Sequence, residues 1–501
     1  MVQILRGLRI SLLIVTLCCV LASGQAEKVV RLNGSTITPA EIEATVNRLI
    51  DLAKVTGIGI AILNDRRIVY LRAFGARDVA NNLPLTPDSV MTAASYTKST
   101  FAVMVMQLVQ SGVLDLDKPI HEYLPKPLPS YPDYQDLADD ERHKRITARM
   151  LLNHTAGFHN LRVLNKGRLQ INFEPGSRYA YSGEGIQLLQ FVVETITNTP
   201  VNDLMRARIF KPFGMTRTSM VWEPAFETDY ANAYNEWGRS MGPQRRTRAG
   251  AAGSMQTTLA DFSRFVEGVM QGKGLDARTR AEMFRPQVTI LSRRQFPTLS
   301  TETTDQNKSI ALSYGLGWGV FSSPAGKAVF KEGHDEGFQH YTVMFDDSGT
   351  GMVMMSNSSN AEGIFRELSE TLIRNTYTPF EWEGYVPYTE RPALPPPPER
   401  RELIVDPALL DSYAGRYQAQ GQPAWIVARE GNHLTVVEDG DTERVTLIGV
   451  ASPIWPFRAT GQDFHAPRTD ADVRFERDAN GRVTEVIVNV KGLILRARRI
   501  D

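Results

Sequence analysis

The spacing of apolar residues predicts a helix and then a β-hairpin near the beginning of the chain. Apolar side chains recur every three or four residues from 38 to 53, behind a proline at the first helical position, as in an amphipathic helix. Two apolar runs, 57–63 and 66–71, then flank the turn Asn64-Asp65 and predict paired antiparallel strands. A helix followed by a hairpin indicates an α+β fold.

Strand patterns return only late in the chain. The region from 83 to 243 predicts mainly helices and loops, and a further helix is expected from 363 to 377. Between these regions, short apolar runs separated by turns stand at 314–321, 328–332, 341–345 and 352–356. We therefore expect one antiparallel sheet built from both ends of a domain (25–384), with a helical insert between them.

A proline-rich stretch separates this domain from a second one. Residues 385–402 include four consecutive prolines and predict a stiff, extended linker. From 403 to 501 only short strand patterns follow, such as 473–477 and 483–488 around a turn, which indicates a small all-β domain. Two uses of this domain stay open: it folds back to cap a cleft of the first domain, or it stands apart for dimerisation or anchoring.

The first 24 residues differ from the rest of the chain. Arg6 and Arg9 precede an apolar run, 10–21, that ends in Ala22-Ser23-Gly24, which is the pattern of a cleaved export signal (1–24). This run is too short to span a membrane comfortably. We therefore expect a periplasmic or secreted protein without a transmembrane anchor after cleavage.

Composition narrows the chemistry. With 42% hydrophobic and 22% charged residues, the 501-residue chain is an ordinary globular protein. Both cysteines, Cys18 and Cys19, lie inside the predicted signal, which excludes cysteine-protease chemistry and disulfides in the mature chain. The net charge is zero and there is no basic tract, so nucleic acid is not an expected partner. The eight histidines show no metal-ligand spacing, and we expect neither a metal nor another cofactor.

The stretch Ser95-Tyr96-Thr97-Lys98 carries the candidate chemistry. A serine hydroxyl needs a proton acceptor within hydrogen-bond reach before it can act as a nucleophile. If a helix runs from 99 to 113, positions three apart share a face, and the apolar residues that follow would bury Lys98 and favour its neutral form. The alternative is structural: Ser95 as a helix N-cap and Lys98 as a solvated first-turn residue.

The wider sequence resembles the penicillin-recognising serine hydrolases. Within them it is similar to the class C β-lactamase-like group, which includes family VIII carboxylesterases and DD-peptidases. The resemblance covers about 40–377, and residues 403–501 are similar to the lipocalin-like β domain appended to members of this group. The matching stretches are Met91 to Lys98, Leu114 to Asp117, Leu151 to Phe158, Ala252 to Met255 and Tyr314 to Trp318. The resemblance implies a β-lactamase/transpeptidase-like fold.

The resemblance also implies further site residues. Tyr181 matches the family's catalytic tyrosine and would move protons together with Lys98, whereas Gly183 stands where the family has a substrate-binding asparagine. His334 matches the basic residue of the third family motif. The backbone N–H of Gly337 is the candidate that would complete the oxyanion hole with that of Ser95.

The hypothesis is therefore an exported serine hydrolase that forms an acyl-enzyme on Ser95. Its substrate would be a small molecule or short peptide: a carboxylic ester, a D-amino-acid peptide or a β-lactam. Gly183 in place of the family's asparagine and Glu336 in place of a glycine favour the first two at least as much as the third. The rival is a non-catalytic, penicillin-binding-like ligand-binding or sensor protein, and a homo-oligomer stays open.

Overall fold

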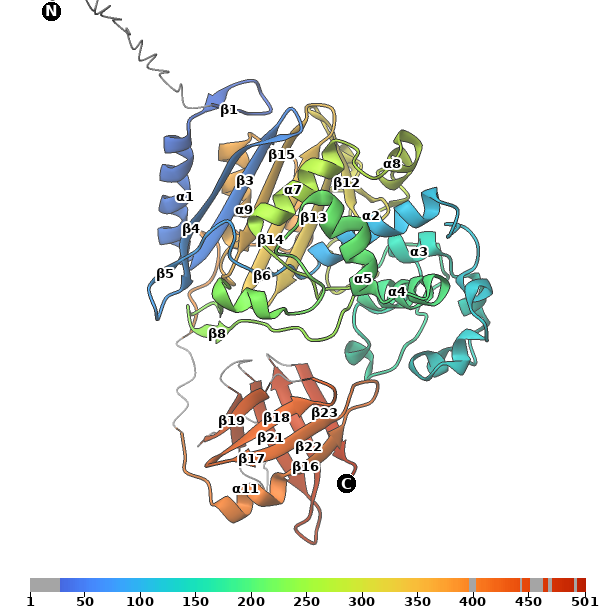
Figure 1. The fold of residues 1–501 in the computed structure, drawn as a ribbon, viewed down its shortest axis with the longest axis vertical. Helices are drawn as coiled ribbons and strands as arrows, with labels where there is room; N and C mark the ends of the chain where they lie inside the picture. Colours follow the sequence, from blue (N-terminus) through green and yellow to red (C-terminus); the bar gives the residue numbers. More distant parts are fainter. Residues whose placement is uncertain (1–27, 396–401, 442–443, 451–462, 467–470, 491–492) are drawn as a thin grey trace, which may run out of the picture.

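The computed structural model describes residues 28–395, 402–441, 444–450, 463–466, 471–490 and 493–501 (Figure 1). The predicted export signal and the last three of the four prolines, 396–398, lie outside these residues. No helix in the described residues is both long and apolar enough to cross a membrane.

A nine-stranded antiparallel sheet forms the centre of the first domain (Figure 1). The late strands and the early hairpin meet where β15 pairs with β3, in the register Val353↔Ala61. The sheet is therefore built from both ends of the domain, as predicted. In sheet order its strands are β10 (Val288–Thr289), β11 (Ser313–Tyr314), β12 (Gly319–Ser323), β13 (Gly326–Asp335), β14 (Phe338–Phe345), β15 (Thr350–Ser356), β3 (Gly57–Asn64), β4 (Arg67–Asp78) and β5 (Leu83–Pro84).

One segment that was expected to form a single strand forms two strands. The run 314–321 divides into β11 and β12 because the backbone leaves the sheet between them: the N–H of Leu316 donates to Met283 and that of Gly317 to Leu152. Gly317 has a φ of +82°, a left-handed conformation that L side chains rarely adopt. The expected helix at 363–377 is also shorter, since α9 ends at Leu372.

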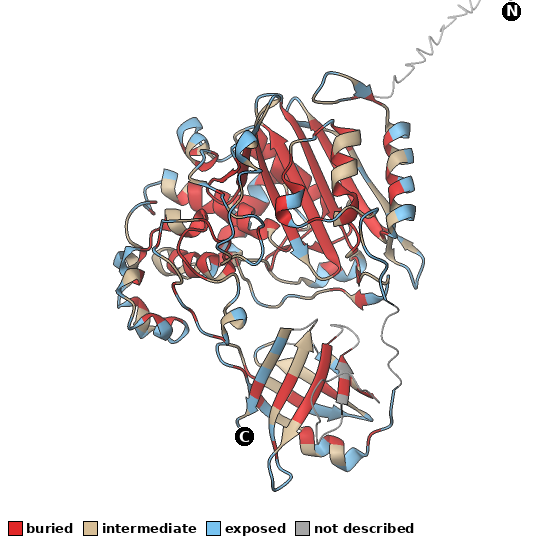
Figure 2. Cartoon of the chain, turned by 180° about the vertical axis from the view of Figure 1, so that it is seen from behind, coloured by how far each residue is buried: buried red, intermediate tan, exposed pale blue. Residues whose placement is uncertain are grey.

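Helices cover both faces of the sheet, and its central strands are buried (Figure 2). The helices α1 (Pro39–Ala53), α9 (Glu362–Leu372) and α10 (Phe380–Glu383) pack on one face. The helices α2 (Tyr96–Gln110) and α7 (Leu259–Met270) lie on the other. Thr38 and Glu41 form a capping box at the start of α1, as its sequence predicts.

The helical insert joins β5 to β10. Its other helices are α3 (Ala148–Leu152), α4 (Gly183–Thr197), α5 (Val201–Met205), α6 (Lys211–Phe213) and α8 (Ala277–Met283). Two-stranded pairs are β1 (Val29–Val30) with β2 (Thr36–Ile37), β6 (Met91–Thr92) with β9 (Gln256–Thr257), and β7 (Ala233–Tyr234) with β8 (Ser240–Gly242). Short segments of 3-10 or π helix span Ile120–Tyr123, Leu128–Ser130, Pro132–Leu137, Glu141–Arg145, Arg162–Asn165, Arg206–Phe210, Pro224–Thr228 and Lys308–Ile310.

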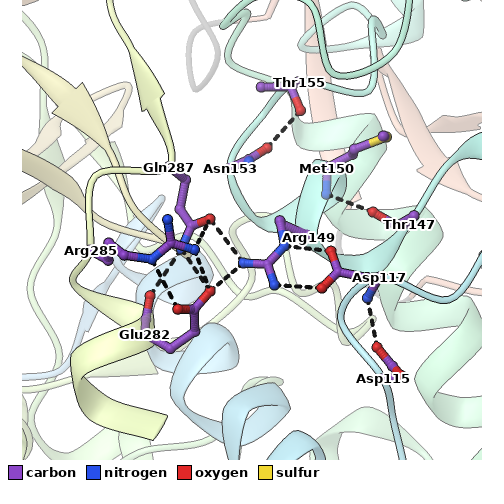
Figure 3. Close-up of polar contacts among 10 residues, drawn as sticks. All are labelled: Asp115, Asp117, Thr147, Arg149, Met150, Asn153, Thr155, Glu282, Arg285 and Gln287. Atoms are coloured by element: carbon purple, nitrogen blue, oxygen red, sulfur yellow. Dashed lines mark hydrogen bonds and ion pairs between the residues drawn. The ribbon is translucent and has the colours of Figure 1, made fainter. Parts of the chain in front are cut away.

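An ion-pair network ties parts of this insert together (Figure 3). Arg149 on α3 donates two hydrogen bonds to the Asp117 carboxylate, at 2.6 and 2.7 Å, and also pairs with Glu282 on α8. Arg285 binds the same Glu282 carboxylate at 2.8 Å. Charge-assisted, bidentate contacts of this kind hold segments in a defined geometry.

The second domain is a closed antiparallel barrel, in agreement with the expected lipocalin-like β domain. The helix α11 (Pro407–Tyr413), which the sequence pattern did not predict, precedes it, with Asp406 as its N-cap. The barrel has its own core, separate from those of the first domain. Its strands are β16 (Gly415–Gln418), β17 (Trp425–Glu430), β18 (His433–Glu438), β19 (Arg444–Val450), β20 (Asp463–Ala466), β21 (Ala471–Arg477), β22 (Val483–Val490) and β23 (Leu493–Arg499).

The chain stays bound to the first domain beyond the boundary expected at Gly384. Tyr385 is buried in the core shared by α1, α9 and α10. The N–H of Tyr388 donates to Gly363, and Arg391 donates to the Asn360 carbonyl. The first part of the expected linker therefore belongs structurally to the first domain.

Candidate active site

Ser95 lies in a tight turn directly before α2. Ala94 has a φ of +48°, and the helix begins at Tyr96, three residues earlier than expected. Although Ser95 occupies the N-cap position, its side chain makes no capping hydrogen bond. Its Oγ instead accepts a hydrogen bond from Lys98 Nζ at 3.0 Å. This geometry favours the nucleophile over the structural alternative.

Lys98 is almost completely buried, with 3% of its surface exposed. Nearly every residue of α2 is buried, because the helix runs through the middle of the domain. Besides Ser95 Oγ, Lys98 Nζ donates to the Ala252 carbonyl oxygen at 2.5 Å. Burial lowers the pKa of Lys98 to about 7, and the charge of Lys331 lowers it further while Glu332 opposes the shift. The amine can therefore accept a proton near neutral pH.

Tyr181 completes the predicted group. Its phenol is 2% exposed and hydrogen-bonds with the Ser95 side chain, and Lys98 Nζ lies 5.0 Å from the ring centre. Burial raises the pKa of Tyr181 well above its ordinary value, and the Glu332 carboxylate raises it further. The phenol is therefore neutral at pH 7 and can donate a proton.

His154 holds the segment that carries Tyr181. Its carbonyl oxygen accepts the N–H of Ala180, and its ring Nδ1 accepts the N–H of Ser182. The ring centre lies 4.5 Å from that of Tyr181. Burial lowers the pKa of His154 well below its ordinary value, and Lys98 and Lys331 lower it further, so the ring is neutral and can accept from Ser182. His154 thus positions the loop.

Lys331, which the sequence-based hypothesis missed, is the basic residue beside Tyr181. It is fully buried on β13, and its Nζ donates to the Tyr181 hydroxyl at 3.3 Å and to Glu332 Oε1 at 2.5 Å. The pairing of β12 with β13 ends at Gly319↔Phe330, so Lys331 is the first residue beyond it. The motif Lys331-Glu332-Gly333 was the available signal, since it is a Lys-x-Gly on a strand.

His334 lines the cleft that contains Ser95, whereas Gly337 needs correction. The His334 side chain is 59% exposed, and its Nδ1 lies 2.6 Å from Glu362 on α9. The N–H of Gly337 donates to Ser359 Oγ, so it is not available to an oxyanion. Gly337 serves the β13–β14 turn instead: its φ is +73°, and an added Cβ would lie 2.6 Å from that of Ala233.

Gly333 is the glycine that the site requires. A Cβ at this position would lie 2.9 Å from the carbonyl oxygen of Ala93, in the turn that presents Ser95. The absence of a side chain therefore allows the edge of β13 to lie against this turn. His334 and Asp335 follow on the strand and line the same cleft as Ser95.

Gly183 lies in the cleft, but Asn160 fills the space beside it. The Asn160 carbonyl and Oδ1 both accept the Gly183 N–H, at 3.0 and 2.9 Å. A Cβ on residue 183 would lie 2.8 Å from the Asn160 carbonyl oxygen. A different segment therefore supplies the side-chain amide at this part of the cleft.

The cleft has a volume of about 670 Å³ and receives residues from both domains. Ser95 and Lys98 form its base, the segment 245–254 forms one wall, and Glu438 and Asp441 of the barrel reach it from the other domain. Arg248 contacts the Glu438 carboxylate and the Asp439 carbonyl. The described residues contain no group of three side chains that could hold a metal ion.

The fold is that of the β-lactamase/transpeptidase class of serine hydrolases. The sequence model of the family described as Beta-lactamase matches residues 42–372, so the chain belongs to this family and is a serine hydrolase.

Curated relatives and solved structures agree with this assignment. The chain is 23% identical to penicillin-binding protein 4* of Bacillus subtilis (strain 168), over 73% of this chain and 80% of the relative. It is 24% identical to the D-alanyl-D-alanine-carboxypeptidase/endopeptidase AmpH of Escherichia coli (strain K12), over 61% and 80%. The octameric penicillin-binding protein homologue from Pyrococcus abyssi superposes with a TM-score of 0.54 at 18% identity, over 92% of this chain and 99% of that one.

Proposed function

We propose that the protein is an exported hydrolase that cleaves an ester or amide bond through an acyl-enzyme on Ser95. The observation that carries the proposal is the 3.0 Å contact between Lys98 Nζ and Ser95 Oγ at a lysine whose pKa is lowered to about 7. A buried amine that is partly neutral at pH 7 and touches a serine hydroxyl is suited to general-base catalysis. The carboxylic ester, the D-amino-acid peptide and the β-lactam are the candidate substrates.

In acylation, Ser95 Oγ attacks the carbonyl carbon and gives its proton to neutral Lys98. The Ser95 N–H faces the developing oxyanion. The backbone at the edge of β13 beyond Gly333 faces it from the other side, in the role that had been expected for Gly337. Because its phenol is neutral, Tyr181 gives its proton to the departing alcohol or amine and regains one from Lys98. Water then attacks the carbonyl carbon of the Ser95 ester and gives a proton to neutral Lys98. Lys98 and Tyr181 pass this proton to Ser95 Oγ as the acid leaves.

Substitution of the nucleophile tests this proposal. We expect Ser95→Ala to abolish turnover of p-nitrophenyl acetate and to remove the covalent adduct that a fluorophosphonate leaves in the intact-protein mass. The melting temperature should stay within a few degrees of the wild type. Hydrolysis that survives in Ser95→Ala contradicts the assignment. A wild-type chain that neither turns over an ester nor forms an adduct supports the rival, a ligand-binding or sensor protein.

The location and assembly are part of the same proposal. The apolar run at 10–21 behind Arg6 and Arg9 supports export to the periplasm or the medium. N-terminal sequencing of the protein recovered from outside the cytoplasm should begin near residue 25. Light scattering of the same material measures whether it forms a homo-oligomer.

A further inference from the structure

Almost all cations in and beside the cleft are paired with a carboxylate of the protein itself. If the cleft binds substrate as proposed above, the charges that it leaves for a substrate decide which substrates fit. The cations in question are Lys98, Arg245, Arg246 and Arg248, which line the cleft, and Lys331, which contacts the Tyr181 hydroxyl.

The innermost cation is Lys331. Its Nζ lies 2.5 Å from Glu332 Oε1, and both residues are buried. Gln295 Nε2 donates to the same Glu332 oxygen at 3.2 Å, which holds the carboxylate in place. Burial raises the pKa of the neighbouring Glu383 well above its ordinary value. The carboxylate that pairs with Lys331 is therefore that of Glu332.

The arginines of the wall are also paired. Arg245 binds the Glu227 carboxylate through two hydrogen bonds of 2.8 Å. Arg246 lies 2.7 Å from Asp335 on the edge of β13. A substrate carboxylate that approached either guanidinium would meet a second negative charge beside it.

The barrel pairs the remaining arginine. Arg248 Nη1 lies 3.2 Å from Glu438 at the end of β18, and Asp441 lines the cleft next to it. The barrel therefore adds negative charge at the mouth of the cleft.

We propose that this cleft selects substrates whose leaving group carries no carboxylate, and that Glu332 and Glu438 are the residues that set this selectivity. Among the residues that the structure describes, a substrate carboxylate in the cleft would gain no arginine or lysine partner without a carboxylate of its own, apart from Lys98, which must be neutral to act as the base. It would also compete with Glu332, Asp335 and Glu438 for the cations that these carboxylates already hold. Neutral esters and amides avoid this competition. The expected substrates are therefore uncharged next to the scissile bond, unlike peptides that end in a free carboxylate at that point.

A matched pair of esters tests this selectivity. Acetyl esters of 3-hydroxybenzoic acid and of 3-hydroxybenzamide present the same scissile bond and leaving groups of similar size, but only the first carries a charge. We expect the wild-type kcat/KM to favour the neutral ester by at least about tenfold. Equal rates, or a preference for the charged ester, would overturn the proposal.

Two variants assign the effect to its residues. Glu332→Gln keeps the side-chain shape and removes the charge, and it should reduce the preference at least about fivefold. Glu438→Gln changes a partly exposed barrel residue and should reduce the preference about two- to threefold. The matched control is Glu367→Gln on α9, which removes one carboxylate from an exposed pair with Arg48 of α1, away from the cleft, and should leave the preference unchanged.

The outcomes separate this proposal from the general one. A preference that Glu332→Gln and Glu438→Gln both leave intact, with both variants folded, contradicts the role of these residues. If Glu332→Gln does not fold, the wild-type ratio and Glu438→Gln still decide. A failure of the proposed function would give a different result. In that case Ser95→Ala would not reduce the hydrolysis of either ester.

Discussion

Charged residues are placed at two ends of α2 in contrasting ways. At its N-terminal end, Lys98 is buried, has no carboxylate partner among its hydrogen bonds and has a pKa of about 7. Beside its C-terminal end, in the hollow lined by Met106 and Gln110, Arg149 is paired with two carboxylates that reach the solvent. The first arrangement favours proton transfer, whereas the second favours a fixed structure.

The pKa values show what each arrangement does to stability. Hydrogen bonds from Arg285 lower the pKa of Glu282 to about 2, and those from Arg149 and Gln287 add to it, so folding favours the charged carboxylate. For Lys98 the direction is the opposite, because burial favours the uncharged amine and folding competes with protonation. The molecule therefore gains stability from charge at one end of α2 and loses some at the other.

The largest expected effect comes from the N-terminal end of α2, where the proposed proton path lies. Lys98→Met and Tyr181→Phe should each lower kcat by about a hundredfold or more, because each removes a step of the proton path. The double variant should lose far less than the product of the two, since groups that act as a unit are not additive. Steady-state kinetics on p-nitrophenyl acetate measures this. Independent, multiplying losses would assign one of the residues a structural role.

Lys98 should also control the pH dependence. Because the amine must be neutral, kcat/KM should fall about tenfold per pH unit below about 7. Its folded-state pKa lies below the unfolded value, so its contribution to stability is least favourable below pH 7 and improves as pH rises toward 10.5. Chemical unfolding of Lys98→Met should therefore show a gain over the wild type that is larger at pH 6 than at pH 9. A gain that does not depend on pH would contradict this linkage.

The barrel should matter less for rate than for substrate size. A chain that ends at residue 395 keeps Tyr385 and Arg391 in place and removes a domain with a separate core. Because Glu438 and Asp441 line the cleft, this truncation should raise the activity on bulky esters several-fold relative to acetyl esters. An unchanged ratio, accompanied by a change in oligomer size alone, would mean that the barrel serves assembly.

The smallest effect on activity is expected at the other end of α2. Arg149→Met should lower the free energy of unfolding by roughly 1–2 kcal/mol, since its partners are only partly buried, and leave kcat unchanged. Arg285→Met changes a more exposed partner of the same Glu282. It should lower the free energy of unfolding by less than about 1 kcal/mol.

The destabilisation by Arg149→Met should shrink in acid. The contribution of Glu282 is present above its unfolded pKa of 4.5 and is lost as the pH falls toward about 2. Urea unfolding at pH 7 and pH 3 gives the comparison. A loss of activity in Arg149→Met at full stability would instead extend the active site to this network.

Much of the architecture follows from patterns within short segments. The hairpin of β3 and β4, the late strands and the all-β second domain agree with the prediction because alternation and turns are local properties of the chain. The helix α11 lies outside what the pattern predicted, since Pro407–Tyr413 is too short for its periodicity to stand out.

The sequence by itself determined the pair Ser95 and Lys98, because a spacing of three residues at the start of a helix places both on one face. Only the tertiary structure decided which basic residue lies beside Tyr181. A strand offers Lys331 and His334 as candidates, and the pairing of β13 with β12 and β14 determines which of them is buried. The tertiary structure also places Asn160 beside Gly183 and brings Glu438 to the cleft. These contacts join segments far apart in the chain, and sheet register and domain docking depend on the packing of the whole molecule.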